Sequence, residues 1–219
     1  MIAIAGDSWG EGQYLDIPEG KPGPKWPGFH YYWVLNGEHP IINVSRGGYS
    51  NHQAVSALEM HLCHRNSPVI DTVVIWLTCV LRDYPAKSNI LDVDSWTQRH
   101  YQNIFDRLIA IAQNNNCRIH ILGGLGDIPT SFPTQLSPEV SIMLHSTAKF
   151  INPEYNLESP YGHFTLVENI HNIDQRHRTF LALEKKFNYM QSRKDIYPDG
   201  AHFGTMAYQQ IFNYVQSKI

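Results

Sequence analysis

Four short apolar segments, each bounded by turn residues, constrain the fold of this chain more than any other feature. They are Ile2 to Ala5, Pro40 to Val44, Thr72 to Leu77 and Arg118 to Leu122. Their apolarity is continuous rather than alternating, which favours strands covered on both faces, as in a parallel sheet. These segments therefore predict the central sheet of the protein.

Helical patterns separate these segments. The clearest runs from about Ser95 to Asn115, where apolar side chains recur at spacings of three and four and Ser95 is the expected N-cap. Shorter patterns cover Ala54 to His64 and Met206 to Val215. Alternating strands and helices predict an α/β fold, a three-layer α/β/α sandwich around a parallel sheet with right-handed crossovers.

A chain of 219 residues can bury about 70% of its unfolded surface, which predicts a single domain over residues 1–219. Two stretches depart from the alternation. Residues 10–37 form a long proline-rich segment, expected to be a loop followed by an aromatic helix near Tyr31 to Leu35. Residues 127–194 are expected to be an insertion that covers the site, with helical character near Ser137 to Phe150 and Asp174 to Met190.

Charge and apolar content exclude several classes of partner. The formal net charge is -3 and no run of five like charges occurs, which argues against nucleic-acid binding. No segment approaches the roughly 20 apolar residues of a membrane span. The segment Met1 to Ala5 meets Gly6 without a basic leader, and three cysteines fit a reducing compartment, so we expect a cytoplasmic protein without a signal peptide.

The strongest local motif is Gly6-Asp7-Ser8-Trp9-Gly10, directly after the first predicted strand. A serine at this turn can present its hydroxyl at the carboxyl end of a parallel sheet, where a nucleophile is expected. An ordinary loop turn is the alternative for this motif taken alone.

A second motif, Asp199-Gly200-Ala201-His202, comes just before the last predicted helix. A serine nucleophile needs a base within hydrogen-bond reach, and the base needs an acceptor that fixes its tautomer. Asp199 and His202 could present both groups on one turn. The alternative is a capping aspartate beside a surface histidine.

Together the two motifs resemble the SGNH, or GDSL-type, hydrolase superfamily. The resemblance covers nearly the whole chain in topology but only short blocks in sequence. It implies a flavodoxin-like sandwich and hydrolysis of an ester or amide through an acyl-enzyme, with Ser8 as nucleophile, His202 as general base and Asp199 as its partner. It implies no metal and no cofactor.

The family's second block supplies an oxyanion-hole glycine. Asn43 to Asn51 fits this block, with Gly48 the better match because Ser50 and Asn51 then open a helix. By this resemblance the backbone N–H groups of Ser8 and Gly48 would face the developing oxyanion. A strand-to-helix turn that merely needs glycine is the alternative.

The third block departs from the family, which carries Gly-x-Asn-Asp after the third strand. This chain reads Thr78-Cys79-Val80-Leu81-Arg82-Asp83, so the oxyanion asparagine is absent. The candidate replacements are, in order, the Thr78 hydroxyl, Arg82 and Asn51. Divergent members associated with phage genomes resemble this chain in carrying a Trp-Thr-x-x-x-Arg-like run here.

Two functions of different class follow. The first is a serine esterase that acts on a small acyl ester, such as an O-acetyl group on a carbohydrate. The second is a binding or virion-accessory protein that keeps the fold with a degenerate site, because fold does not dictate function. A phage-encoded chain would act in the host cytoplasm or the virion. The sequence leaves the oligomeric state open.

Overall fold

The computed structural model describes residues 1–11, 13–14, 26–27, 40–64, 68–84, 92–162, 167–168, 170–198 and 202–219. Its centre is a parallel sheet of five strands with the order β4-β1-β5-β6-β7. The strands are β1 (Ile2–Ala5), β4 (Ile41–Asn43), β5 (Thr72–Leu77), β6 (Arg118–Gly123) and β7 (Val140–Leu144). Counted along the chain this is the order 2-1-3-4-5 of flavodoxin-like folds, which confirms the predicted fold class.

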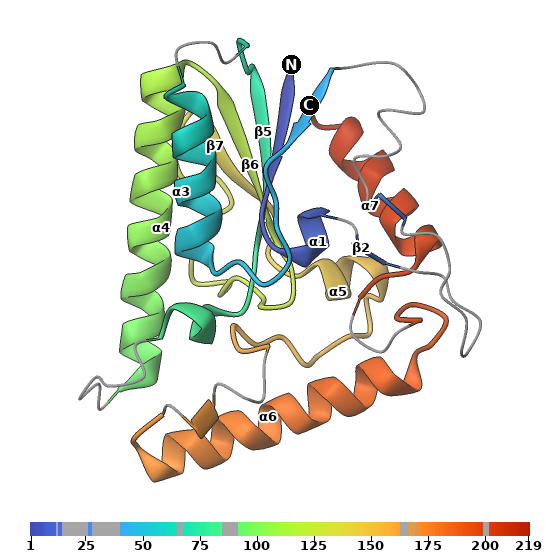
Figure 1. Ribbon diagram of the computed structural model, residues 1–219. Coiled ribbons are helices and arrows are strands. Elements are labelled where there is room, and N and C mark those ends of the chain that lie inside the picture. Colours follow the sequence, from blue (N-terminus) through green and yellow to red (C-terminus); the bar gives the residue numbers. More distant parts are fainter. Residues whose placement is uncertain are drawn as a thin grey trace.

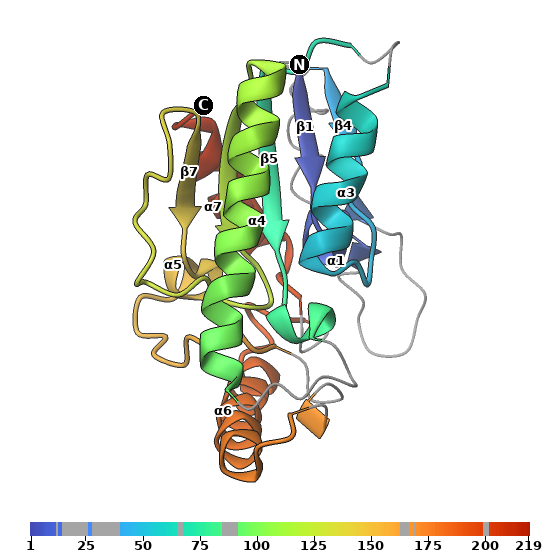
Figure 2. The same ribbon diagram turned by 90° about the vertical axis from the view of Figure 1, so that its left-hand side faces the viewer.

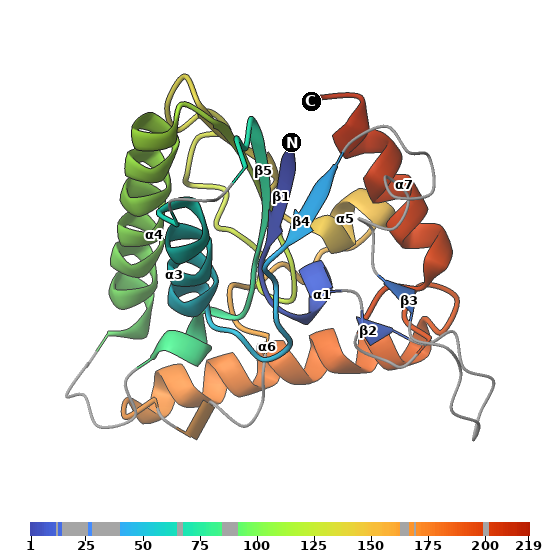
Figure 3. The same cartoon turned by 45° about the horizontal axis from the view of Figure 1, so that its top comes forward.

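Helices cover both faces of the sheet (Figures 1 and 3). One face carries α3 (Asn51–Leu62) and α4 (Val93–Asn115), and the other carries α5 (Thr147–Ile151) and α7 (Thr205–Gln216). Every residue of β1 and β5 is buried as a result. The continuous apolarity of these strands thus reflects their burial by helices on both faces of the sheet, as predicted.

The remaining elements lie at the carboxyl edge of the sheet, toward which the strand arrows point in Figure 2. The short helix α1 (Ser8–Glu11) follows β1, the 3₁₀ helix η1 (Val80–Asp83) follows β5, and the long helix α6 (Ile173–Ser192) crosses below this edge. Ser8, Gly48 and Thr78, which follow β1, β4 and β5, are at this same edge.

Local capping decides where the helices begin. Ser50 caps α3 with a reciprocal capping box to Gln53. The cap of α4 is Asp92 rather than the predicted Ser95, because the Asp92 carboxylate already accepts the backbone N–H groups of Asp94 and Ser95. Ser95 lies inside the first turn, where its hydroxyl donates to Asp92.

The prediction of a helix near Ser137 to Phe150 is wrong in its first part, which forms the edge strand β7. Val140, Ile142 and Leu144 are buried while the two residues between them are half-buried, a period of two that fits a strand. A helix begins only at Thr147, capped by Ser146. Residues 127–194 therefore add one strand to the sheet and one short helix to a layer before α6.

Most of the predicted proline-rich loop over residues 10–37, with its helix near Tyr31 to Leu35, lies outside the described residues. Within the loop, the structure describes the start of the segment and a pairing of β2 (Gln13–Tyr14) with β3 (Trp26–Pro27). No helix of the described part of the chain is both long and apolar enough to cross a bilayer.

Candidate active site at the carboxyl edge of the sheet

Ser8 occupies the first position of α1, immediately beyond the end of β1. The turn that places it needs glycine at position 6, where φ is 140° and an added Cβ would lie 2.8 Å from Trp76 Cβ. Asp7 then orders the start of α1, because its Oδ1 accepts the N–H of Trp9 at 2.9 Å. The side chain of Ser8 is consequently fixed at the sheet edge and is partly exposed.

The structure brings Ser8 and His202 together across 194 positions of the chain. Ser8 Oγ lies 3.4 Å from His202 Nε2. Packing next to this pair sets the distance: the rings of Trp9 and Phe203 meet edge to face at 4.5 Å, and the Tyr208 hydroxyl donates to the Trp9 carbonyl at 3.4 Å. Helix α7 is thereby held against α1, with His202 directed at the serine.

Asp199 lies outside the described residues, so its predicted role stays a prediction. The chain on both sides of it is anchored. Tyr197 is buried and stacks on Phe203 at 5.1 Å, and the N–H of Gly204 donates to the Ile196 carbonyl at 2.9 Å.

Gly48 sits at the third position of a tight turn, with φ at 83°. The turn is closed by the N–H of Tyr49, which donates to the Arg46 carbonyl at 3.1 Å, and a positive φ at this position is typical of a type II turn. Arg46 in turn donates its N–H to the Gly6 carbonyl at 3.2 Å. The Gly48 turn and the Ser8 turn are therefore joined to each other by backbone hydrogen bonding.

Asn51 cannot serve as the missing oxyanion donor, which contradicts that alternative. Its side chain is fully buried and both of its polar atoms bind the backbone of Thr78. Oδ1 accepts the Thr78 N–H at 2.7 Å, and Nδ2 donates to the Thr78 carbonyl at 3.3 Å. The Asn51 amide thus fixes the end of β5. Because its oxygen and nitrogen are both bound to Thr78, the amide does not face an oxyanion.

Behind Asn51 lies a buried contact between a histidine and an aspartate. His100 Nε2 is 3.2 Å from Asp83 Oδ2 and 3.5 Å from Asn51 Nδ2, and the His100 ring stacks on Trp96 at 5.0 Å. Burial would raise the pKa of Asp83, but hydrogen bonds from His100 and Ser50 outweigh it and lower the pKa. The contact therefore ties η1, which ends at Asp83, to helix α4, which carries His100.

Arg82, the second candidate donor, has a different partner that sequence reasoning missed. Its Nη1 donates to Asp7 Oδ2 at 3.0 Å and to the Tyr49 carbonyl at 2.9 Å. The Asp7 carboxylate has no exposed surface, so a cation is needed beside it. The only sequence signal for this pairing was an arginine shortly after the third strand.

Thr78, the first candidate, has a side-chain hydroxyl for which the described residues offer no hydrogen-bond partner. The residue is 1% exposed and directly follows β5, the neighbour of β1. The described part of the chain shows no group of three His, Cys, Asp or Glu side chains that could hold a metal ion.

No family model matches the sequence, and no curated relative does at significant similarity. Solved structures similar over nearly the whole chain include the psychrotrophic esterase EstA from Pseudoalteromonas sp., with 15% identity over 99% of this chain and 97% of that one and a TM-score of 0.48. A lipase/acylhydrolase from Enterococcus faecalis shows 15% identity over 100% and 94%, with a TM-score of 0.43. The acetylxylan esterase Axe2 from Geobacillus stearothermophilus shows 14% identity over 99% and 92%, with a TM-score of 0.44.

Proposed function

We propose that this protein is a serine hydrolase of the SGNH, or GDSL, type that cleaves a small acyl ester through an acyl-enzyme. The observation that carries the proposal is the 3.4 Å approach of Ser8 Oγ to His202 Nε2 at the carboxyl edge of the sheet. Contacts between nucleophile and base are often this long before substrate binds. The strand order also supports the proposal, because ligands bind at the carboxyl edge of open parallel sheets with this order.

In the proposed reaction, Ser8 Oγ attacks the acyl carbon while its proton passes to His202 Nε2. The resulting imidazolium then protonates the alcohol oxygen, the ester bond breaks and the alcohol leaves. Water attacks the acyl-serine by the same route, which releases the acid and restores Ser8. In this scheme the Asp199 carboxylate accepts a hydrogen bond from the Nδ1–H of His202, which fixes the tautomer of the ring and stabilises the imidazolium.

The oxyanion would be stabilised by the backbone N–H groups of Ser8 and Gly48 and by the Thr78 hydroxyl. Two observations support this set. The Ser8 and Gly48 turns are hydrogen-bonded through Arg46 and Gly6, and Asn51 is already committed to the backbone of Thr78.

The proposed substrate is a small-molecule or carbohydrate ester, such as an O-acetylated sugar. The mechanism requires no cofactor and no metal. We expect no nucleic-acid or membrane partner, in line with the net charge of -3, and a cytoplasmic location.

Labelling with a fluorophosphonate serine probe tests the proposal directly. The wild-type protein should give a stoichiometric adduct that mass spectrometry locates on Ser8. Ser8→Ala should abolish the adduct, and His202→Ala should slow its formation by at least about a hundredfold because the base is lost. An adduct that forms equally well in His202→Ala would exclude Ser8–His202 catalysis.

One observation favours the second candidate, a binding or virion-accessory protein. The Asn51 amide is bound to the backbone of Thr78 and Nη1 of Arg82 is bound to Asp7, so two of the three replacements considered already hold structural partners. Loss of one donor costs about 10² to 10³ in kcat, which weakens a catalyst without abolishing it. Ser8-dependent turnover on any ester would remove the reason for this candidate.

A further inference from the structure

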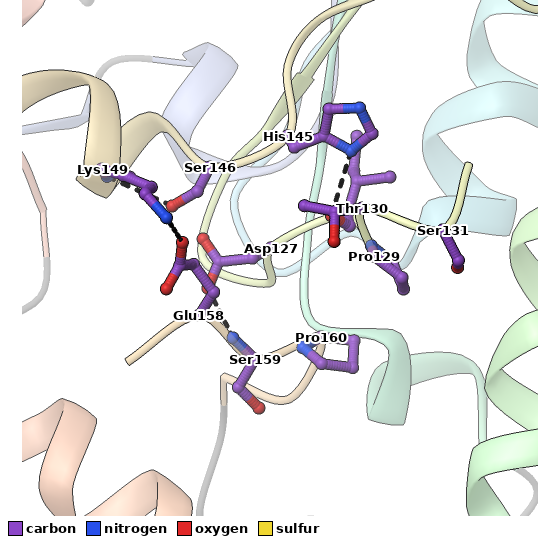
Figure 4. Close-up of a pocket in the computed structure, with 11 residues that line it drawn as sticks. Asp127, Pro129, Thr130, Ser131, His145, Ser146, Lys149, Glu158, Ser159 and Pro160 are labelled. Carbon is purple, nitrogen blue, oxygen red and sulfur yellow. Dashed lines mark hydrogen bonds and ion pairs between the residues drawn. The ribbon is translucent and has the colours of Figure 1, made fainter. Parts of the chain in front are cut away.

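A cavity of about 700 Å³ opens at the carboxyl edge, beyond β6 and β7 (Figure 4). We call it the Asp127 cavity, and its walls include Asp127, Thr130, His145, Lys149, Glu158 and Pro160. Neither Ser8 nor His202 lines it. Because β1, β6 and β7 are parallel strands of one sheet, the cavity and Ser8 lie on the same edge.

The charges in the wall of the Asp127 cavity are compensated in pairs. Asp127 is 3% exposed, and its Oδ2 accepts hydrogen bonds from Lys186 Nζ and the Ser159 N–H, each at 2.8 Å. Lys149 pairs with Glu158, and both are drawn on the same side of the cavity in Figure 4. Each carboxylate and ammonium group of the described wall thus already has an opposite charge beside it, so the wall offers no unpaired charge of this kind to a charged ligand.

The wall nevertheless keeps acceptors that need donors. Asp127 Oδ1 is buried and has no hydrogen-bond partner among the residues that the structure describes. An unsatisfied buried acceptor costs about 1–3 kcal/mol, so such an atom indicates a missing donor. His145 Nδ1 lies 3.3 Å from the Ile128 carbonyl, which can only accept, so Nδ1 is the donor in this contact and Nε2 is the ring nitrogen left for a ligand.

The cavity also presents features that suit a ring with hydroxyl groups. Thr130 is exposed at its rim and offers a hydroxyl that can donate or accept. Pro129 and Pro160 give it apolar surface without further polar groups. The volume lies within the range of small-molecule sites.

We propose that the Asp127 cavity binds a neutral polyhydroxylated ligand, a sugar ring whose hydroxyl groups donate to Asp127 Oδ1 and His145 Nε2. That this ring is the alcohol part of the substrate rests on the proposed function. The sugar would then anchor the ester at the edge where Ser8 attacks.

The binding step is tested on the full chain with Ser8→Ala, which cannot turn substrate over. Cellobiose and xylobiose are the neutral probes, and glucuronic acid and glucosamine are charged counterparts, each titrated by ligand-observed NMR. We expect the neutral sugars to bind and the charged ones to bind at least tenfold more weakly. If neither neutral disaccharide binds at tens of millimolar, the proposal is overturned.

Location is tested with matched exposed threonines. Thr130→Trp fills the mouth of the Asp127 cavity and should weaken disaccharide binding at least tenfold, whereas Thr134→Trp, outside the wall, should leave it unchanged. In the Ser8-containing protein, Thr130→Trp should lower kcat/KM for acetylated cellobiose at least tenfold more than for p-nitrophenyl acetate. Equal binding by both tryptophan variants would place the sugar elsewhere and refute the proposal.

The two proposals fail separately. If Ser8 forms no adduct and hydrolyses no ester while disaccharide binding still responds to Thr130→Trp, the esterase function is wrong and the sugar site stands. If Ser8 is acylated but no neutral sugar binds, the sugar site is wrong and the esterase function stands.

Discussion

A single arginine joins the three loops that converge on Ser8. Arg82, after β5, binds Asp7, the residue before Ser8, and the Tyr49 carbonyl at the end of the Gly48 turn. The geometry is that of one guanidinium nitrogen shared between a buried carboxylate and a backbone oxygen. Arg82 is thus a positioning residue, since it acts on the site through Asp7 and Tyr49.

Replacing Arg82 should therefore misalign Ser8 rather than remove a reacting group. We expect Arg82→Ala to slow fluorophosphonate labelling of Ser8 by about ten- to a hundredfold, because small misplacements of a nucleophile have effects of this size. Arg82→Lys should restore part of the rate, since lysine keeps the charge but not the planar donor fork.

The measurement is the labelling rate in folded protein, with Arg99→Ala on the exposed side of α4 as the matched control. Comparing kcat with KM separates alignment from binding, since the effect should fall on kcat. A full rate in Arg82→Ala would show that Arg82 has only a structural role.

At the scale of elements, the pairing of β6 with β7 buries a histidine in the sheet. His120 is 8% exposed, and its Nδ1 lies 3.0 Å from Ser141 Oγ on the neighbouring strand. Burial, assisted by Arg118, lowers the pKa of His120 to about 4 from an ordinary value of 6.5. The folded protein thus holds this imidazole neutral.

The consequence is a loss of stability in mild acid. Below about pH 6.5 the unfolded chain takes up a proton at His120 that the folded protein binds only near pH 4, so the stabilisation present at neutral pH is lost between these values. We expect His120→Asn to reduce the fall in unfolding free energy between pH 7.5 and pH 5 by about 2 kcal/mol.

Urea unfolding at the two pH values measures this difference, with His171→Asn at an exposed position as control. An identical pH dependence in wild type and His120→Asn would contradict the assignment.

At the scale of the whole molecule, α6 is fastened across the carboxyl edge at three places (Figures 1 and 2). Gln175 accepts the N–H of Val93 at 3.0 Å, the Asn152 amide donates to the Tyr189 hydroxyl at 2.7 Å, and Lys186 is buried between them along the helix. Lys186 Nζ binds Asp127 Oδ2 at 2.8 Å and the Leu125 carbonyl at 2.9 Å. Both chain ends lie at the opposite edge.

Removing the Lys186 charge should destabilise the whole protein. Lys186→Met leaves the Asp127 carboxylate buried and unpaired, and breaking a buried pair from one side costs about 3–5 kcal/mol. Adding Asp127→Asn to this variant should recover part of the lost unfolding free energy, because the buried carboxylate without a cation is then replaced by a neutral amide.

Denaturant unfolding of both variants tests this, with Lys185→Met on the exposed side of the same turn as control. A loss below about 1 kcal/mol in Lys186→Met would mean that the pair does not fasten α6.

The sequence by itself determined the parallel sheet, its helical layers and the turns that carry Ser8 and Gly48. These features depend on local patterns, since continuous apolarity marks a doubly covered strand and glycine marks a turn wherever they occur. The same local reasoning failed at β7, whose five residues are too short to distinguish a strand from the start of a helix.

The tertiary structure alone decided which polar groups meet. Nothing local to Arg82 indicates that Asp7 needs its charge, and nothing local to Asn51 indicates that Thr78 takes both ends of its amide. These pairings depend on burial. Folding removes water from these polar groups, and each then needs a hydrogen-bond partner from whichever segment packs beside it. The sequence therefore predicted Ser8 and His202 as partners, which lie 3.4 Å apart, while the packing of distant loops determined what holds them in place.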